Sequence, residues 1–387
     1  MQQPTITLFS NFLNHHQIPF CEEMVKLIGN HFKFVATEPI DEERIKLGYQ
    51  DYAKGISYAL NSWESKENHQ EAIRLANESD VVIFGSAPEE WFIKRIKNDQ
   101  LTFRYSERFL KKGLLRLMDP RLWIHRIQTD TIHRNRNFHL LCTGAYAAFD
   151  YALFGSFPGK MYRWGYFPKF MKYELIPPMI KPQDKVNLLW AGRFIGWKRP
   201  AMIVRLMKKL IQFHEDIHLD MIGTGPRLKQ VERLVEKKKL KEHVTLHGAL
   251  SPQEVREYME QAHIFVSTSN KEEGWGAVIN EAMNSGCAVY AYYKIGAAPT
   301  LIQNNHNGIL YVDEHDLFVK LNQRINNPSI LYNLGRNAYW TIEKQWNASI
   351  AAGRFLEAAN ALLEGRSFEF ESGPMSKAKI IIPKIHD

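Results

Sequence analysis

The residues best suited to carry chemistry lie in one stretch of the chain, Ser269–Gly286. In it, Glu273 precedes a Gly-Trp-Gly turn, and Glu281 follows on a helix that should begin near Ala277. Backbone N–H groups at a helix start can bind an anion, and a carboxylate can accept hydrogen bonds from neighbouring hydroxyls of a ribose or hexose. Each glutamate taken alone is most simply a surface acid. The strand expected over Ile264–Ser267 and the flanking glycines favour a ligand site instead.

A second candidate segment, Gly192–Pro200, directly follows the strand expected over Val186–Trp190. Its Arg193 and Lys198 should lie where open α/β sheets bind ligands, beyond the carboxyl ends of the strands. A guanidinium fork and an ammonium point charge together suit a diphosphate, and Gly192 permits a ligand to approach the backbone closely. Two isolated cations would more simply be solvated surface residues. The hypothesis of a diphosphate site therefore depends on the other motifs of this half of the chain.

A glycine-rich turn, Gly223-Thr224-Gly225-Pro226, follows a further expected strand, Leu219–Ile222. On its own it is more simply a structural turn than a phosphate loop, and it lacks the G-x-x-x-x-G-K-[S/T] pattern of a P-loop. Farther along, Leu246–Glu254 reads Leu-His-Gly-Ala-Leu-Ser-Pro-Gln-Glu. No two aspartates are two positions apart, so the sequence contains no Asp-x-Asp metal clamp.

Taken in order, these four motifs, including the E-x7-E glutamate pair, resemble the retaining GT-B glycosyltransferases of family 4. The resemblance spans about residues 186–312, whereas the first half of the chain shares only the α/β pattern. Two positions depart from the commonest pattern of the family. Trp275 stands where the family often has Phe, and Asn280 stands where it often has Leu. Neither change removes a required polar group.

The resemblance implies roles for individual residues. Arg193 and Lys198 would hold the donor diphosphate and Glu273 would contact the donor sugar, so these three are the expected catalytic residues. Glu281 would accept hydrogen bonds from the ribose hydroxyls, and Leu250 would lie near the base. The expected donor-binding set is Gly192, Arg193, Lys198, Gly223, Leu250, Glu273, Gly274, Trp275, Gly276, Ala277 and Glu281.

We expect the reaction to need no metal, because protein groups can neutralise the departing nucleoside diphosphate. Arg193, Lys198 and a helix N-terminus supply such groups, and losing one transition-state contact of this kind typically costs on the order of 10²–10³ in rate. The resemblance further implies a retaining reaction on the face from which the diphosphate leaves. There the phosphate itself can take the proton of the acceptor, so no dedicated carboxylate base is expected.

The expected function is therefore transfer of a sugar from a nucleotide diphosphate-sugar to a glycan or lipid-linked glycan. A place in bacterial surface-polysaccharide synthesis is implied by the habit of the family alone. One alternative is a non-catalytic GT-B partner or glycan-binding protein. Another is a nucleotide-sugar epimerase or a phosphorylase on the same fold.

Short apolar runs alternate with polar helical stretches along both halves of the chain, which predicts parallel sheets covered by helices. The proline-rich stretch Leu175–Lys185 is interpreted as a linker. The expected fold is thus α/β of the GT-B type, with two doubly wound Rossmann-like domains facing across a cleft. The first, residues 1–178, would bind the acceptor, and the second, residues 185–345, the nucleotide-sugar. A helix over about residues 349–366 is expected to pack back on the first domain.

The acceptor side carries fewer signals. His15 and His16 follow the first expected strand, and their imidazoles could donate to the diphosphate or to an acceptor hydroxyl. A loop with ordinary surface histidines fits the same residues equally well. Glu107 comes at the end of the strand expected over Leu101–Tyr105, and the resemblance makes it a candidate for orienting the acceptor, because such enzymes often place an acceptor-orienting residue there. A helix is expected next, over Arg108–Leu117.

Basic residues are frequent between Lys94 and Arg136, where twelve cations face four acids and leucines are interleaved. Such a segment can form a basic amphipathic surface that lies on anionic lipid, or a solvated basic face over an ordinary core. The sequence leaves both open. The chain of 387 residues has 50 lysines and arginines against 42 acids, a net charge of +8. No basic-aromatic repeat points to a nucleic-acid module, so no nucleic acid is expected as a partner.

The expected location is the cytoplasm, with peripheral contact to the inner face of the cell membrane left open. Three distant cysteines, Cys21, Cys142 and Cys287, form neither a metal pair nor a disulfide framework. The first residues lack the pattern of a secretory signal, and no apolar run reaches the roughly 18 residues of a spanning helix. The expected partners are a nucleotide-sugar donor and a glycan or lipid-linked acceptor.

Overall fold

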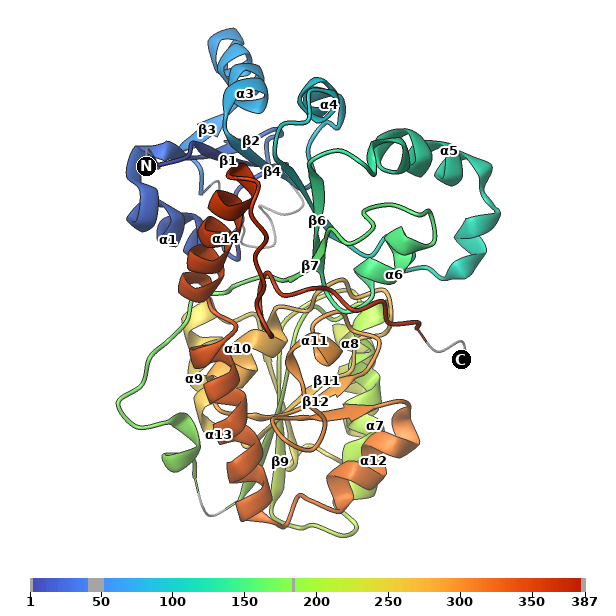
Figure 1. Cartoon of the computed structure of the whole chain (residues 1–387). Helices are drawn as coiled ribbons and strands as arrows, with labels where there is room; N and C mark the ends of the chain where they lie inside the picture. The colour runs from blue at the N-terminus through green and yellow to red at the C-terminus, as the bar shows by residue number, and fades with distance from the viewer. Residues whose placement is uncertain (1–2, 41–51, 183–184, 384–387) are drawn as a thin grey trace. The chain divides into compact units, whose positions relative to one another are not determined.

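The computed structural model describes residues 3–40, 52–182 and 185–383, and its chain forms two compact units. Unit 1 comprises residues 1–169 and 347–387, and unit 2 comprises residues 170–346. Each unit is built on one sheet whose strand pairs are all parallel (Figure 1). The predicted α/β class with two Rossmann-like sheets is confirmed.

The sheet of unit 1 has the strand order β3-β2-β1-β4-β5-β6-β7. Its strands are β1 (Ile6–Ser10), β2 (Phe32–Ala36), β3 (Ala59–Asn61), β4 (Val81–Phe84), β5 (Thr102–Glu107), β6 (Phe138–Thr143) and β7 (Met161–Trp164). Every residue of β1, β4 and β6 is buried. Continuous burial is expected for parallel strands, because helices cover both faces of such a sheet.

The helices of unit 1 are α1 (Ile18–Ile28), α3 (Lys66–Glu78), α4 (Glu90–Lys97), α5 (Pro120–Thr129), α6 (Ala147–Ala152) and α14 (Ala348–Leu363). Helix α14 begins where the Asn347 side chain accepts a hydrogen bond from the backbone N–H of Ile350. It packs against α1, and its Phe355 ring lies 6.2 Å from that of Phe20 and 5.1 Å from that of Phe103. The apolar face of α14 is therefore buried within unit 1.

The sheet of unit 2 has the strand order β10-β9-β8-β11-β12-β13. Its strands are β8 (Val186–Ala191), β9 (Ile217–Ile222), β10 (Val244–Gly248), β11 (Ile264–Ser267), β12 (Ala288–Tyr292) and β13 (Ile309–Tyr311). Its helices are α7 (Pro200–Leu210), α8 (Leu228–Lys237), α9 (Pro252–Gln261), α10 (Val278–Asn284), α11 (Ala298–Leu301), α12 (Glu314–Asn322) and α13 (Pro328–Lys344). The strand order reverses between β8 and β11, a point at which α/β sheets commonly bind ligands.

The segment that precedes β8 is fastened to unit 2 by a buried lysine. The ammonium of Lys181 donates to the carbonyls of Met259, Glu260 and Ala262, at the end of α9, and to that of Ser285, just after α10. A cation is stabilised at such helix C-termini because the free carbonyls carry partial negative charge. The backbone N–H of Met171 also bonds the side chain of a unit 2 residue. Residues 170–178, expected in the first domain, thus group with unit 2.

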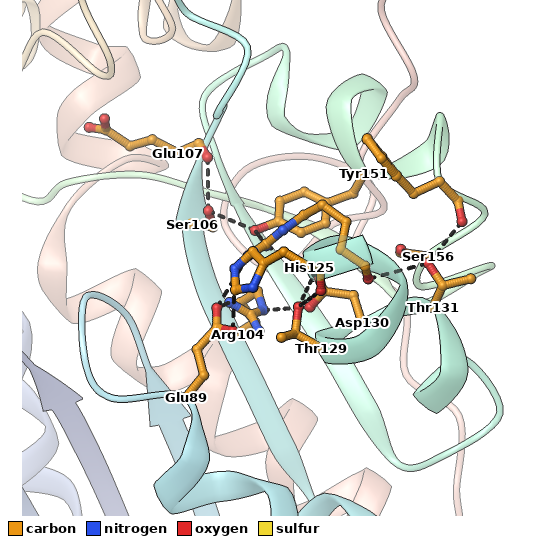
Figure 2. A network of polar contacts seen from close by, with 12 residues as sticks. Glu89, Arg104, Ser106, Glu107, His125, Thr129, Asp130, Thr131, Tyr151 and Ser156 are labelled. Carbon is orange, nitrogen blue, oxygen red and sulfur yellow. Dashed lines mark hydrogen bonds and ion pairs between the residues drawn. The ribbon is translucent and has the colours of Figure 1, made fainter. Parts of the chain in front are cut away.

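A buried network of ion pairs fixes α5 to the sheet of unit 1. Arg104, on β5, contacts Glu89 at 2.6 Å and Asp130 at 2.8 Å, as Figure 2 shows. Arg126, on α5, contacts the second oxygen of Asp130 at 2.9 Å. The Tyr151 hydroxyl donates to Ser106 at 3.0 Å beside these groups. Although burial opposes ionisation of the carboxyl, Arg104 and Arg126 hold the pKa of Glu89 below its usual range.

The helix expected over Arg108–Leu117 is wrong. Residues 114–118 form a single 3₁₀ segment, η2 (Leu114–Met118), and the α-helix of this region is α5, farther along the chain. The Asp119 side chain caps α5 by accepting from the backbone N–H of Arg121, and Pro120 occupies its first turn. The leucines within η2 are exposed or half-buried, whereas α5 is attached to the sheet through Arg126.

The C-terminal tail lies along the edge strand of the unit 1 sheet. Residues 375–378 run antiparallel to β7, with hydrogen bonds from Arg163 N–H to Ser376, from Met375 N–H to Arg163 and from Ala378 N–H to Met161. The tail therefore supplies partners for backbone groups at this edge. The three cysteines are buried and form no disulfide. Among the described helices, none combines the length and the apolar character needed to cross a bilayer.

We expect Asp130→Asn to destabilise unit 1 by about 3–5 kcal/mol, the usual cost of leaving buried charges without their partner. Arg104 and Arg126 would both lose an ionised contact. Urea unfolding followed by circular dichroism measures the change. Arg121→Ala is the control, because the side chain of Arg121 is 89% exposed, and it should leave stability nearly unchanged. Equal stability of the two variants would contradict the structural role of the network.

Candidate functional site

The candidate site of unit 2 is formed by loops that leave the carboxyl ends of its strands. Because the strands are parallel, the loops after β8, β9, β10 and β11 leave the sheet at one edge. Residues 192–199 follow β8, and residues 268–277 follow β11. These two strands are neighbours at the point where the strand order reverses. The two segments singled out from the sequence therefore start side by side.

The Gly223–Gly225 turn supports the loop after β8 through backbone contact. A Cβ on Gly223 would lie 2.0 Å from the carbonyl oxygen of Gly192, and a Cβ on Gly225 would lie 2.7 Å from that of Phe194. Both glycines have positive φ, and Phe194 N–H donates to Thr224 at 2.8 Å. The glycines are thus required by the approach of two backbones, which matches the structural interpretation of this turn.

Lys198 and Glu273 meet across the reversal point. The Lys198 ammonium lies 2.5 Å from a carboxylate oxygen of Glu273, and both side chains are largely buried. Gly276, at φ +87°, lies close enough that a Cβ on it would be 3.5 Å from Cγ of Glu273. Lys198, on the β8 loop, therefore contacts the residue that directly precedes the Gly274–Gly276 turn.

Arg193 occupies a more exposed position on the same loop. Its guanidinium carbon lies 5.6 Å from the ring centroid of Trp197. A third cation, Arg227, was missed by the sequence reasoning, although it directly follows the Gly-Thr-Gly-Pro turn. Its guanidinium lies 3.3 Å from the point where a Cβ of Gly196 would be. The structure thus brings a third cation to the β8 loop.

Backbone hydrogen bonds from residues 296 and 297 hold the Gly274–Gly276 turn in place. The carbonyls of Gly274 and Trp275 accept hydrogen bonds from Gly296 N–H at 3.0 Å and Ala297 N–H at 2.9 Å. The Trp275 side chain is buried in the core, where its indole N–H donates to Asn280 at 2.7 Å. Only the backbone at these positions can line a ligand. The two departures from the family pattern therefore compensate each other, the tryptophan needing an acceptor that asparagine supplies.

Glu281 lies on α10 with its carboxylate unsatisfied. Among the described residues, none donates a hydrogen bond to that carboxylate. Arg256 stands nearby but donates to the Glu281 backbone carbonyl and to the side chains of Asn284 and Ser285. Burial raises the pKa of Glu281, and the charge of Arg256 opposes this only in part. A half-buried carboxylate can accept hydrogen bonds from a ligand that brings hydroxyl donors.

Leu250 and Ala277 both lie just outside a helix of unit 2. Leu250 follows β10, next to Ser251, which caps α9 in a complete capping box with Glu254. Ala277 is the residue before α10. Across the described residues, no group of three or more histidine, cysteine or carboxylate side chains could hold a metal ion.

In unit 1, the three candidate acceptor residues are linked by a tyrosine that sequence reasoning missed. The ring of His16 stacks on Tyr166, with centroids 5.7 Å apart and planes inclined by 7°. The Tyr166 hydroxyl donates to Glu107 at 2.9 Å, and Lys111 also pairs with that carboxylate. His15 lies against His16, with ring centroids 3.7 Å apart. No motif marks Tyr166, which follows the last strand of the sheet.

Both histidines are neutral in the folded protein near pH 7. Burial lowers the pKa of His15, and burial together with the neighbouring His15 lowers that of His16 to about 3. Nδ1 of His16 is buried without a hydrogen-bond partner. The pair can therefore exchange hydrogen bonds with a ligand but cannot offer it a positive charge.

We expect Asn280→Leu to cost about 1–3 kcal/mol in the free energy of unfolding, because the buried indole N–H of Trp275 loses its acceptor. Adding Trp275→Phe should recover most of that loss, since both polar groups are then gone. Urea unfolding of the two single variants and the double variant measures the coupling. Strictly additive effects would show that the two positions are independent.

The sequence and the fold both match known proteins. Residues 173–340 match the family model described as Glycosyl transferases group 1. The chain is 24% identical over 147 residues to the phosphatidylinositol N-acetylglucosaminyltransferase GPI3 subunit of Saccharomyces cerevisiae, an alignment that covers 37% of this chain and 32% of that protein. It is 27% identical over 144 residues to the poly(glycerol-phosphate) alpha-glucosyltransferase of Bacillus subtilis, covering 37% of this chain and 21% of that protein.

The chain thus spans about a third or less of the length of these two relatives. Among solved structures, Anabaena HepE in complex with UDP superposes with a TM-score of 0.67, covering 92% of this chain and 99% of that one. At 11% identity this likeness shows the fold alone. The chain therefore has the GT-B fold, and its residues 173–340 match the Glycosyl transferases group 1 family model.

Proposed function

We propose that the protein transfers a sugar from a nucleotide diphosphate-sugar to a glycan or lipid-linked glycan, with retention of configuration and without a metal ion. The observation that carries this proposal is the meeting of Lys198, Glu273 and the Gly274–Gly276 turn at the reversal point of the unit 2 sheet. The match of residues 173–340 to the Glycosyl transferases group 1 family model supports it. Work in bacterial surface-polysaccharide synthesis and a cytoplasmic location belong to the same proposal.

In this proposal, the diphosphate of the donor replaces Glu273 as the partner of the Lys198 ammonium. Without a ligand, Lys198 is neutralised by Glu273. A bound diphosphate brings oxygen atoms that compete for that ammonium and that Arg193 can reach from the same loop, and charge-assisted bonds of this kind are the strong ones. Glu273 is then available to accept hydrogen bonds from the donor sugar. The ribose diol provides the hydroxyl donors that the Glu281 carboxylate lacks in the protein alone.

The transfer step uses the leaving group as its base. The bond from the anomeric carbon to the diphosphate oxygen breaks while the acceptor oxygen attacks from the same face, and the acceptor proton passes to a departing phosphate oxygen. Lys198 and Arg193 stabilise the negative charge that develops on the diphosphate. In unit 1, the neutral His16 and the Glu107–Tyr166 pair would orient the acceptor hydroxyl.

The names of similar proteins guide the choice of ligands. HepE is described in complex with UDP and with UDP-glucose, so UDP-sugars are the first donors to test. The named acceptors of the relatives differ, since one name specifies phosphatidylinositol and another poly(glycerol-phosphate). The acceptor must therefore be found by screening.

The first test is a thermal-shift panel of nucleotide-sugars and nucleoside diphosphates, followed by transfer assays with the best donor. A ligand at about 100 times its Kd adds about 2.7 kcal/mol of stability. Transfer with release of nucleoside diphosphate in excess chelator, giving a product of the same anomeric configuration as the donor, is the expected result. Binding without transfer would favour a non-catalytic partner, and conversion of the donor without an acceptor would favour an epimerase.

We expect Arg193→Ala to lower kcat by roughly 10²–10³ with little change in donor KM, because its guanidinium acts on charge that develops in the transition state. Glu281→Ala should instead raise donor KM by about 10–100-fold, the range for lost hydrogen bonds to a charged group. Steady-state kinetics with varied donor separates the two effects. Arg233→Ala, on the exposed side of α8, is the matched control. Unchanged kinetics in both site variants would exclude these roles.

Donor binding should weaken as the pH falls. The raised pKa of Glu281 means that its carboxylate takes up a proton at a higher pH than an ordinary glutamate. The protonated form loses an acceptor for the ribose diol, so donor KM should rise as the pH falls, and this rise should begin at a higher pH than for an ordinary glutamate. Glu281→Gln cannot titrate and should flatten this dependence. The same pH profile in the wild type and in this variant would assign the titration to another group.

A further inference from the structure

Helix α5 has an inverted distribution of side chains. Its one buried residue is Arg126, whereas three of its large apolar residues, Trp123, Ile124 and Ile127, are exposed and Leu122 is half-buried. Trp123 is 38% exposed, Ile124 55% and Ile127 41%. At about 100° per residue, these three side chains lie within roughly one third of the helix circumference. An ordinary surface helix buries such a stripe and exposes its charges, so α5 presents outward the face that should be covered.

The segments on either side of α5 extend this apolar face. In η2, Leu115 is 82% exposed and Met118 81%, and after α5, Ile132 is 62% exposed. We name these six residues the α5 surface: Leu115, Met118, Trp123, Ile124, Ile127 and Ile132. They fall within 18 consecutive positions of the chain. Scattered exposed apolar residues need no explanation, but a concentration of large ones marks an interaction site.

The charges around the α5 surface are positive. Exposed cations of the same segment are Lys112, Arg116, Arg121, Arg134 and Arg136. Between residues 108 and 136 the only acids are Asp119 and Asp130. Asp119 is paired with Arg121 at 3.0 Å, and Asp130 is fully buried between Arg104 and Arg126. A partner of this surface must therefore combine an apolar layer with negative charge.

The α5 surface is held in place before any partner arrives. The ion pairs of Arg126 fix the inner side of α5, and Asp130, which closes the helix, lies with Glu89 around Arg104 in Figure 2. The Trp123 indole N–H donates to the Leu117 carbonyl at 2.8 Å, and its ring lies 4.5 Å from that of Phe154. Ordering these residues adds no cost at the moment of binding, which favours a surface built for docking.

We propose that the α5 surface docks unit 1 on an anionic lipid bilayer. The apolar side chains would enter the boundary between headgroups and acyl chains, while the surrounding cations bind lipid phosphates, as in interfacial amphipathic helices. A bilayer supplies negative charge and an apolar layer together over a wide area, which fits both properties of the surface. The docking stands apart from the proposed sugar transfer, because it needs neither a donor nor the residues of unit 2.

Vesicle flotation tests the docking directly. The full-length protein is mixed with vesicles of phosphatidylglycerol and phosphatidylcholine or of phosphatidylcholine alone. We expect binding to the anionic vesicles, weakened by added salt, and little binding to the neutral ones. Lys112→Gln with Arg134→Gln should reduce partitioning by roughly fivefold for each charge removed. The charge-matched control is Lys229→Gln with Lys237→Gln, on the exposed side of α8, which should bind like the wild type.

The apolar contribution has its own pair of variants. Leu115→Ser with Ile124→Ser should lower partitioning by at least about tenfold, because two large side chains no longer leave water. Phe213→Ser in unit 2 removes an apolar side chain that is 62% exposed and should have no effect. Since the α5 variants change exposed residues, circular dichroism should show an intact fold. Equal loss in the α5 variants and in both controls would overturn the proposal.

A fluorescent probe reports whether the surface itself enters the bilayer. Met118→Cys introduces one exposed thiol into a chain whose three cysteines are buried, and a polarity-sensitive dye is attached to it. The emission should shift to the blue on anionic vesicles, and the dye on Phe213→Cys should not respond. No shift at position 118, or a shift that depends on protein concentration without vesicles, would overturn the proposal in favour of no docking or of self-association.

Discussion

The contact between Lys198 and Glu273 is the one on which the candidate donor site depends. It joins the loops of β8 and β11 at the reversal point of the sheet, so neither charge is left without a partner before a ligand binds. Burial of an unpaired ammonium or carboxylate would be costly. The ion pair therefore allows both side chains to remain charged although they are largely buried. A ligand that binds Lys198 takes the place of Glu273 as the partner of the ammonium.

The glycine positions show which parts of this site could be predicted from short stretches of sequence. Strands followed by Gly-rich turns predicted where the loops leave the sheet, because parallel strands place those turns at one edge. That rule brings the loop of Lys198 next to the loop of Glu273, whereas the contact between the two side chains was seen only in the structure. The compensation between Trp275 and Asn280 needed coordinates, although both residues were visible as departures from the family pattern.

Other features could not be predicted because their causes are distant in sequence. Helix α5 forms around Arg126, whose partners include Glu89, 37 positions earlier, and no local periodicity signals an arginine as the buried residue. The leucines before it are instead largely exposed or half-buried in η2. Tyr166 joins His16 to Glu107 only because β7 lies beside β6 in the sheet. Apolar patterning finds sheets and helices, but it does not find polar contacts between them.

The strand-like tail at residues 375–378 covers a sheet edge through which the molecule could otherwise associate with other copies of itself. An open sheet edge offers free amide and carbonyl groups to any passing extended chain. Here β7 would be such an edge, and Met375, Ser376 and Ala378 occupy its bonding positions. A version of the chain that ends before Met375 would lose the buried Met375 and Ser376 side chains and would leave β7 as an open edge for intermolecular pairing.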